Sequence, residues 1–165
     1  EEEFLVSSTR AAWHIELADA VSKDGWILGR RTLTLHDSGA YARFSPYGLT
    51  KHAFHHSGAY TIPNLRFDGF VCFTNRVPTT AMRGFGVTIG DFALESQMDR
   101  IARLLKMDPI ELRMLNAYRD GDMKAHRKKA EGCALVEVMQ KAAAMTGRNL
   151  PERFKKMSSL NKEGL

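Results

Sequence analysis

Residues 13–36 read WHIELADAVSKDGWILGRRTLTLH, and this stretch decides the fold class. From residue 13 to residue 21, apolar residues alternate with polar or small ones, which is the period of a half-buried strand. Asp24-Gly25 then forms a strong hairpin turn, and the strand pattern resumes over residues 26–36. We therefore expect a long antiparallel hairpin, whose apolar faces carry Trp13, Ile15, Leu17 and Val21 on the first strand and Ile27, Leu33 and Leu35 on the second.

The region that follows the hairpin predicts one helix and one strand. Pro46 suits the first turn of a helix, and Gly58 is a candidate stop signal. Residues 67–74 are rich in aromatic and β-branched side chains, which favour a strand. Since residues 70–73 are all apolar, we expect that part of the strand to be buried on both faces.

The second half of the chain predicts three helices. Apolar residues recur at helical spacing after Thr88 and Asp91, either of which can cap the helix. Asp108-Pro109 marks a second start, because aspartate caps helices and proline fits their first turn. The last helix is expected over residues 135–146, with Val138, Met139 and Ala142 facing inward.

This order of elements, strands before helices, favours an α+β fold. We expect a two-layer sandwich, with a mainly antiparallel sheet covered by helices on one face. Residues 1–150 are expected to form a single domain. Residues 151–165 are polar and basic, and they are expected to form a flexible tail.

Composition excludes several classes of function. The net charge is +5, but no zinc-finger spacing or RNA-binding aromatic signature accompanies it, so we expect no nucleic-acid partner. No apolar run is long enough for a membrane span, and we expect a cytoplasmic protein. Cys72 and Cys133 form no CxxC pair. His52 and His56 have a metal-compatible spacing but no third ligand is evident, so we expect solvated or hydrogen-bonded histidines and no metal site.

The run Ala81-Met82-Arg83-Gly84-Phe85-Gly86 is the candidate for chemistry. Glycines allow positive φ and close approach of a ligand to the backbone, and the helix that follows offers free N–H donors and a positive dipole end. Arg83 adds a fixed cation. Two interpretations remain open on these grounds. The run is either a ligand loop or a tight strand-to-helix turn in which Phe85 fills the core and Arg83 is solvated.

Short signatures follow one another in a fixed order along the chain. They are Ile62-Pro63-Asn64, Thr74-Asn75, Pro78, Ala81, Arg83-Gly84-Phe85-Gly86, Phe92-Ala93, Glu95, Met98-Asp99, Ala102, Asp108-Pro109, Glu111, Arg113, Asn116, Gly121-Asp122 and Gly132-Cys133-Ala134-Leu135. This order resembles the molybdopterin-binding region of xanthine dehydrogenase, aldehyde oxidase and nicotinate dehydrogenase-type enzymes. The resemblance spans nearly the whole chain, and its central run is highly specific.

The resemblance implies roles for five residues. Arg83 corresponds to an arginine near the molybdenum centre, and Gly84 and Gly86 correspond to glycines whose backbone lies against the cofactor. Phe85 matches the aromatic residue that stacks on a planar substrate in purine hydroxylases. Lys51 sits roughly where those enzymes carry a substrate-polarising arginine. A lysine can still stabilise negative charge there, but without the planar fork of arginine.

This sequence also departs from the family pattern. Val87-Thr88-Ile89 stands where the family has a variable residue followed by Pro-Gln, so the glutamine contact to the cofactor is lost. The family's catalytic glutamate, in a glycine-rich segment far downstream, is absent here. We therefore expect a part of a larger molybdenum hydroxylase, inactive when isolated, with no catalytic residue of its own.

The parent enzyme implied by the resemblance would hydroxylate an N-heterocycle such as a purine, or an aldehyde. Its partners would be the remaining molybdopterin-binding segments and the iron–sulfur and FAD domains or subunits. The sequence does not distinguish among these substrates. An alternative is a stand-alone interaction module that keeps the fold without a cofactor.

Overall fold

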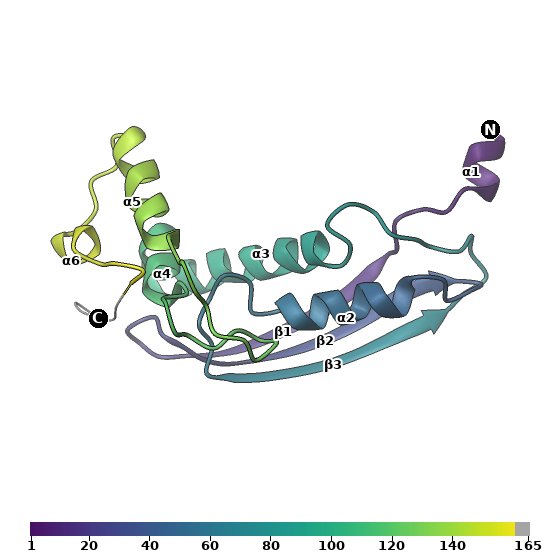
Figure 1. The fold of residues 1–165 in the computed structure, drawn as a ribbon, viewed down its shortest axis with the longest axis horizontal. Coiled ribbons are helices and arrows are strands. Elements are labelled where there is room, and N and C mark those ends of the chain that lie inside the picture. The colour runs from purple at the N-terminus through teal and green to yellow at the C-terminus, as the bar shows by residue number, and fades with distance from the viewer. Residues whose placement is uncertain (161–165) are drawn as a thin grey trace.

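The structure of the chain, a computed structural model, describes residues 1–160. None of the helices in this range is long and apolar enough to cross a membrane. The elements are shown in Figure 1. In chain order they are α1 (Glu2–Val6), β1 (Trp13–Val21), β2 (Ile27–Gly39), α2 (Ser45–His55), β3 (Asn64–Phe73), α3 (Val87–Leu105), α4 (Pro109–Asn116), α5 (Leu135–Met145) and α6 (Glu152–Lys155).

The strands form one mixed sheet in the order β1-β2-β3. β1 and β2 pair antiparallel, so the hairpin around Asp24-Gly25 is confirmed. β2 and β3 pair in parallel, because α2 lies between them in sequence and provides the crossover that parallel pairing requires. The α+β class is confirmed, but the sheet is antiparallel in only one of its two pairings.

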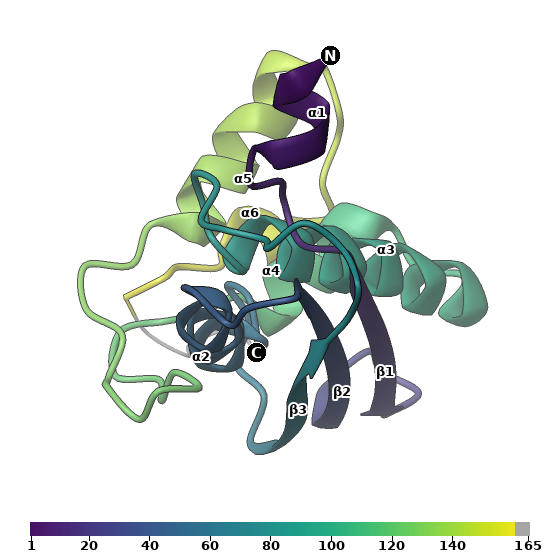
Figure 2. The same cartoon turned by 90° about the vertical axis from the view of Figure 1, so that its right-hand side faces the viewer.

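Helices α2 and α3 lie over the same face of the sheet (Figures 1 and 2). α2 contacts β2 and β3, whereas α3 contacts β1. Within residues 1–160 no helix lies over the opposite face. The layers therefore have the arrangement that the sequence predicts, with helices on one side only.

The buried face of β2 is polar, which corrects the expected inward orientation of Leu33 and Leu35. Directly opposed residues in an antiparallel pair share a face, and Ile15 on the apolar side of β1 is paired with Thr34. Burial of the β1 side chains therefore turns Thr34 inward and leaves Leu35 on the exposed face. The buried polar side chains of β2 are Arg30, Thr32, Thr34, His36 and Ser38.

Two contacts satisfy part of this polar layer. Arg30 donates from Nε and Nη2 to the two carboxylate oxygens of Asp19, at 2.7 and 2.9 Å, and both side chains are buried. The Oγ1 atom of Thr32 lies 3.1 Å from Nδ1 of His56, the C-cap residue of α2. A two-bond guanidinium–carboxylate pair of this kind is the geometry that makes burial of two charges tolerable.

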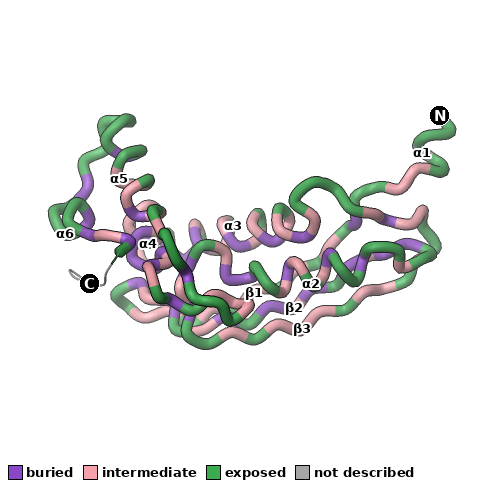
Figure 3. Tube along the Cα trace, viewed as in Figure 1, coloured by how far each residue is buried: buried purple, intermediate pink, exposed green. Residues whose placement is uncertain are grey.

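β3 is an edge strand with an exposed outer side (Figure 3). Phe70 and Phe73 are 58% and 68% exposed, so the expectation that residues 70–73 are buried on both faces was wrong. The reason is positional, because α2 covers only one side of β3 and no described element covers the other.

Two apolar clusters form the core. The first joins the hairpin to α3 and α4 and contains Ile27, Tyr60, Ile62, Leu94, Met98, Ile101, Ala102 and Leu112. The second lies at the other end, among α4, α5 and α6, and contains Met114, Leu115, Ala117, Val136, Ala143, Leu150, Phe154 and Met157.

The second cluster includes residues beyond 150 and corrects the expected orientation of α5. Within residues 151–160, Phe154 and Met157 are buried and α6 forms. Residues 161–165 of the expected tail lie outside the described range. On α5 the most buried residues are Val136 and Ala143, whereas Val138 is 60% exposed. The expected inward face is therefore rotated, because α4 and α6 approach α5 from the side of Val136.

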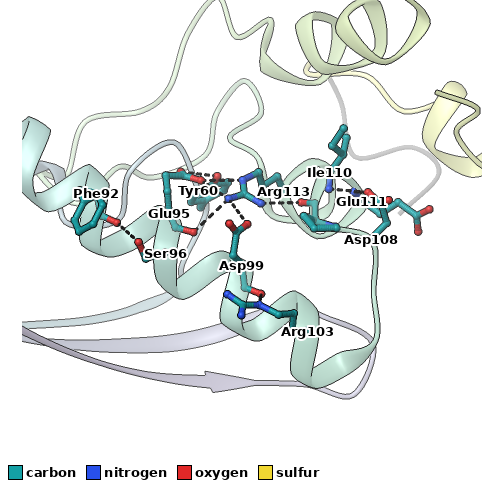
Figure 4. A network of polar contacts seen from close by, with 11 residues as sticks. Tyr60, Phe92, Glu95, Ser96, Asp99, Arg103, Asp108, Ile110, Glu111 and Arg113 are labelled. Atoms are coloured by element: carbon teal, nitrogen blue, oxygen red, sulfur yellow. Dashed lines mark hydrogen bonds and ion pairs between the residues drawn. The ribbon is translucent and has the colours of Figure 1, made fainter. Parts of the chain in front are cut away.

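An ionic cluster joins α3 to α4 (Figure 4). Arg113 of α4 lies 2.8 Å from a carboxylate oxygen of Glu95 and 2.9 Å from one of Asp99, both on α3. The hydroxyl of Tyr60 donates to Glu95 at 2.8 Å. Burial, followed by the neighbouring Glu95 carboxylate, raises the pKa of Tyr60, so it remains a neutral donor.

The start of α4 is capped as expected. Asp108 accepts hydrogen bonds from the backbone amides of Ile110 and Glu111, at 2.8 and 3.3 Å (Figure 4). Asp108→Ala is expected to lower the free energy of unfolding by about 0.5–2 kcal/mol, measured by urea denaturation. Asp108→Asn is the control, because asparagine keeps the cap acceptor while it removes the charge that faces Arg148. Unchanged urea midpoints in Asp108→Ala would contradict the capping role.

Candidate functional site

The turn between β3 and α3 contains the glycine-flanked run found in the sequence. Gly84 and Gly86 have φ of +83° and +84°, values that residues with a side chain rarely adopt. α3 begins at Val87 with Gly86 as its N-cap, and no side chain caps it. The expected caps Thr88 and Asp91 were therefore wrong, since both lie inside the helix. The Thr88 hydroxyl instead accepts from Arg10 at 2.7 Å.

Arg83 is exposed at the start of this turn. Within residues 1–160 its guanidinium has no ion pair or hydrogen bond. It lies just before the N-terminus of a helix of 19 residues, where the helix dipole adds positive potential. A free guanidinium beside a helix N-terminus suits an anionic or oxo group. The residues of this turn therefore fit a cofactor that carries such groups.

Phe85 is half-buried, so it matches neither of the two extreme interpretations. Its ring centroid lies 6.0 Å from that of Tyr47 on α2, with the planes tilted by 39°. A Cβ added at Gly48 would lie 2.9 Å from the Phe85 ring. The ring therefore rests edgewise on α2, and part of it remains accessible.

Lys51 lies close to the same group. Its Nζ atom is 5.2 Å from the centroid of the Tyr47 ring, a cation–π arrangement. The structure thus brings Lys51, Tyr47 and Phe85 together, from two segments that are more than thirty residues apart in sequence. Tyr47 was missed by the sequence analysis. Its spacing of four residues from Lys51 on a predicted helix is the signal that places the two side chains on one face.

Contacts within the protein already account for the two glycines. A Cβ at Gly86 would lie 2.2 Å from the carbonyl oxygen of Gly48, and a Cβ at Gly84 would lie 2.4 Å from Cγ2 of Thr88. These contacts, with the positive φ values, require glycine at both positions. The approach of a cofactor to this backbone remains a prediction.

Three histidines are buried between the sheet and the helices. His36, His52 and His56 are 1%, 2% and 6% exposed, whereas His55 is exposed. Burial lowers the pKa of each of the three to about 4. They are therefore neutral at pH 7. Within residues 1–160, no three His, Cys, Asp or Glu side chains converge in a way that could hold a metal ion.

Comparison with known proteins identifies relatives of this chain. Residues 1–117 match the family model described as the molybdopterin cofactor-binding domain. The nicotinate dehydrogenase large molybdopterin subunit of Eubacterium barkeri is 36% identical over 143 residues, which cover 86% of this chain and 34% of that protein. An aldehyde oxidoreductase of Megalodesulfovibrio gigas is 33% identical over 156 residues, covering 94% of this chain and 17% of that protein.

A solved structure supports the same relationship. The aldehyde oxidoreductase from Desulfovibrio gigas superposes with a TM-score of 0.81 at 34% identity, over 84% of this chain and 15% of that chain. The chain thus spans about a third or less of the length of the relatives it matches. It belongs to the molybdopterin cofactor-binding domain family of the xanthine dehydrogenase- and aldehyde oxidase-like molybdenum hydroxylases.

Proposed function

We propose that this chain forms part of a molybdenum hydroxylase, an oxidoreductase that hydroxylates an N-heterocycle such as a purine, or an aldehyde. The observation that supports this best is Arg83, which is exposed just before α3 and has no ion-pair or hydrogen-bond partner among residues 1–160, in a chain whose family is described as binding the molybdopterin cofactor. When bound, that cofactor supplies the oxygen transfer to carbon and takes up two electrons.

The residues of this chain would bind and orient the reactants. Arg83 would hold an anionic or oxo group of the cofactor, and the backbone at Gly84 and Gly86 would lie along it. The accessible part of the Phe85 ring would stack on a planar substrate. Lys51, held near Phe85 by Tyr47, would stabilise negative charge that develops on the substrate.

The proposed substrate classes and partners follow from the relatives. One relative is named for nicotinate and another for aldehydes, so both classes belong in the test. The proposed partners are the remaining molybdopterin-binding segments and the iron–sulfur and FAD domains or subunits, which carry electrons away. No observation favours the alternative of a module that keeps the fold without a cofactor.

A substrate panel tests the proposed activity. The parent protein should reduce a dye acceptor with at least one of a purine, nicotinate and an aromatic aldehyde. The isolated 165-residue chain should carry no molybdenum and no activity, because the cofactor site requires several segments of the parent. Stoichiometric molybdenum in the isolated chain would contradict the expectation that the cofactor site requires several segments of the parent. A molybdenum-loaded parent that is inactive on all three substrate classes would contradict the proposed reaction.

Phe85→Ala in the parent protein tests the stacking role. Aromatic pairs contribute about 0.5–1.5 kcal/mol beyond their buried area, so kcat/KM for a planar heterocycle should fall by about twofold to twelvefold. The loss will be larger if stacking sets the attack geometry. Both kcat/KM, corrected for molybdenum content, and the urea midpoint should be measured on one preparation. A stability loss of about 3–5 kcal/mol with normal kcat/KM would identify Phe85 as a core side chain instead.

A further inference from the structure

β3 leaves one side of its backbone unpaired. It is the outer strand of the sheet (Figure 2), and within residues 1–160 no strand or isolated bridge pairs with its outer side. The Thr74 amide, just after β3, donates to the Gly39 carbonyl on β2 at 3.0 Å. The Cys72 carbonyl accepts from Ser38, also on β2, at 3.0 Å. Because backbone groups alternate sides along a strand, the amides and carbonyls of residues 65, 67, 69 and 71 point outward.

β3 lacks the backbone features that usually interrupt a sheet edge. Its register with β2 is unbroken from Asn64 to Cys72, so no bulge bends this part of the strand away. None of its ten residues is proline. A long, regular edge is a template for another strand, and native proteins usually cover or interrupt it. The outer edge of β3 is therefore a surface that a further segment can complete.

An apolar groove of about 750 Å³ lies beside the start of this edge. It is formed by β3, the end of α2 and the loop between α4 and α5, and we call it the β3 groove. Its large apolar residues are Phe54, Ile62, Leu65, Phe67 and Met123. Phe54 and Met123 are 47% and 52% exposed. Because Leu65 and Phe67 also carry outward-pointing backbone groups, the edge and the groove form one surface.

The β3 groove carries positive charge only. Lys124 and Arg127 line it, and no Asp or Glu among residues 1–160 does. Within the same range, neither cation has an ion pair or a side-chain hydrogen bond. A partner that carries apolar side chains and a carboxylate is therefore complementary to the groove.

We propose that the β3 groove receives an extended segment of the parent protein, which pairs with β3 as a fourth strand and places a carboxylate beside Lys124 and Arg127. Strand addition draws affinity from main-chain hydrogen bonds and specificity from pockets for alternate side chains. The segment belongs to the same molybdopterin-binding subunit, because this chain matches only 34% of the nicotinate dehydrogenase large molybdopterin subunit. The inference rests on the proposed function, since it names a remaining molybdopterin-binding segment as the partner.

Hydrogen exchange in the full-length parent tests for the added strand. The amides of residues 65, 67, 69 and 71, resolved singly by fragmentation in the mass spectrometer, should exchange at least about tenfold more slowly than free amides. The amides of residues 66, 68, 70 and 72 face β2, so their protection shows that β3 is folded. Outward amides that exchange like free amides, beside protected inward ones, would overturn the proposal.

A zero-length carbodiimide cross-linker identifies the segment in the purified parent. This reagent joins the Lys124 amine to a carboxylate only when the two groups are in contact. We expect a cross-link from Lys124 to an Asp or Glu of the same subunit that lies outside these 165 residues. Cross-links of Lys124 solely within these residues, to another subunit or to a second copy would overturn the proposed partner.

Charge reversal in the parent tests the two groove cations. Lys124→Glu combined with Arg127→Glu places like charges against the segment, so the outward amides should exchange at least about threefold faster than in wild type. Lys128→Glu combined with Lys129→Glu is the matched control. These exposed lysines belong to the same loop but do not line the groove, so exchange should stay unchanged. Equal exchange in the two double variants would overturn the role of the groove cations.

The pterin content of the same preparations separates this inference from the proposed function. Protected outward amides and the expected Lys124 cross-link, in a parent that binds no pterin, would refute the proposed function and leave the added strand intact. A pterin-loaded, active parent whose outward amides exchange like free amides would refute the added strand alone.

Discussion

Replacing Gly86 with alanine is expected to lower the free energy of unfolding of this chain by about 2–5 kcal/mol. Two penalties add. The φ of +84° places the residue in the left-handed region, which costs a side-chain-bearing residue about 1–2 kcal/mol. The added Cβ would also lie 2.2 Å from the Gly48 carbonyl oxygen, and that oxygen belongs to a helix backbone, so α2 and α3 must move apart.

Gly121→Ala is the matched control for this prediction. Gly121 has φ of +87°, but a Cβ there would meet nothing within 4 Å. This variant should therefore show only the conformational penalty. Urea denaturation of both variants and the wild type gives the contact contribution as their difference. Equal losses in Gly86→Ala and Gly121→Ala would mean that α2 does not constrain the turn.

The second large effect is a loss of stability between pH 7 and pH 5. His36, His52 and His56 have folded-state pKa values lowered to about 4 by burial, from an ordinary value of 6.5. Between these values the unfolded chain binds protons that the folded chain excludes, so unfolding is favoured as pH falls. Each histidine should remove about 2 kcal/mol by pH 5, roughly 6 kcal/mol together. The stabilisation that the three neutral histidines provide is fully present above pH 6.5, and it is lost as the pH falls toward 4.

The charged neighbours of these histidines act in the expected directions. Asp37 beside His36 partly raises the pKa of that histidine, and Arg30 lowers the pKa of His56 further. Hydrogen bonds from Ser158 and Ser159 outweigh burial and hold the pKa of Glu137 at about 2. Because the stability from Glu137 is lost only below its ordinary value of 4.5, measurements between pH 7 and pH 5 report the histidines.

Urea midpoints at several pH values measure this effect. His36→Phe should reduce the pH dependence by about a third, since it removes one of three buried titrating rings. His14 lies on the exposed face of β1, so His14→Gln should keep the full dependence. A wild-type chain whose unfolding free energy is constant from pH 7 to pH 5 would show that the three rings are not excluded from water.

Local chemistry predicted much of this fold. The Asp24-Gly25 turn and the Asp108 cap depend on residues that are neighbours in sequence. The face of β2 could not be read this way, because alternation gives the period of a strand but not which side meets the helices. The pairing of Ile15 with Thr34 decided it, and that register depends on the whole hairpin.

The candidate site was also predictable only where neighbouring residues determine its structure. The glycine-flanked turn was evident from its sequence, because glycine is the residue that readily adopts positive φ. The reason for Gly86 was not, because the Gly48 carbonyl that requires it lies on another helix. Tyr47 was missed as part of the site for a similar reason. Its contact with Phe85 depends on the packing of α2 against the start of α3.

The central claim is that the Arg83–Gly86 turn belongs to a molybdopterin-binding site. The most direct measurement is the molybdenum and pterin content per folded molecule of the full-length parent, compared with its Arg83→Ala variant. Arg83 is exposed and has no partner within residues 1–160, so its loss should leave the urea midpoint unchanged. We expect nearly one molybdenum and one pterin in the wild type and a clear loss of both in the folded variant. Equal cofactor content in the two proteins, or a folded wild-type parent without pterin, would contradict the claim.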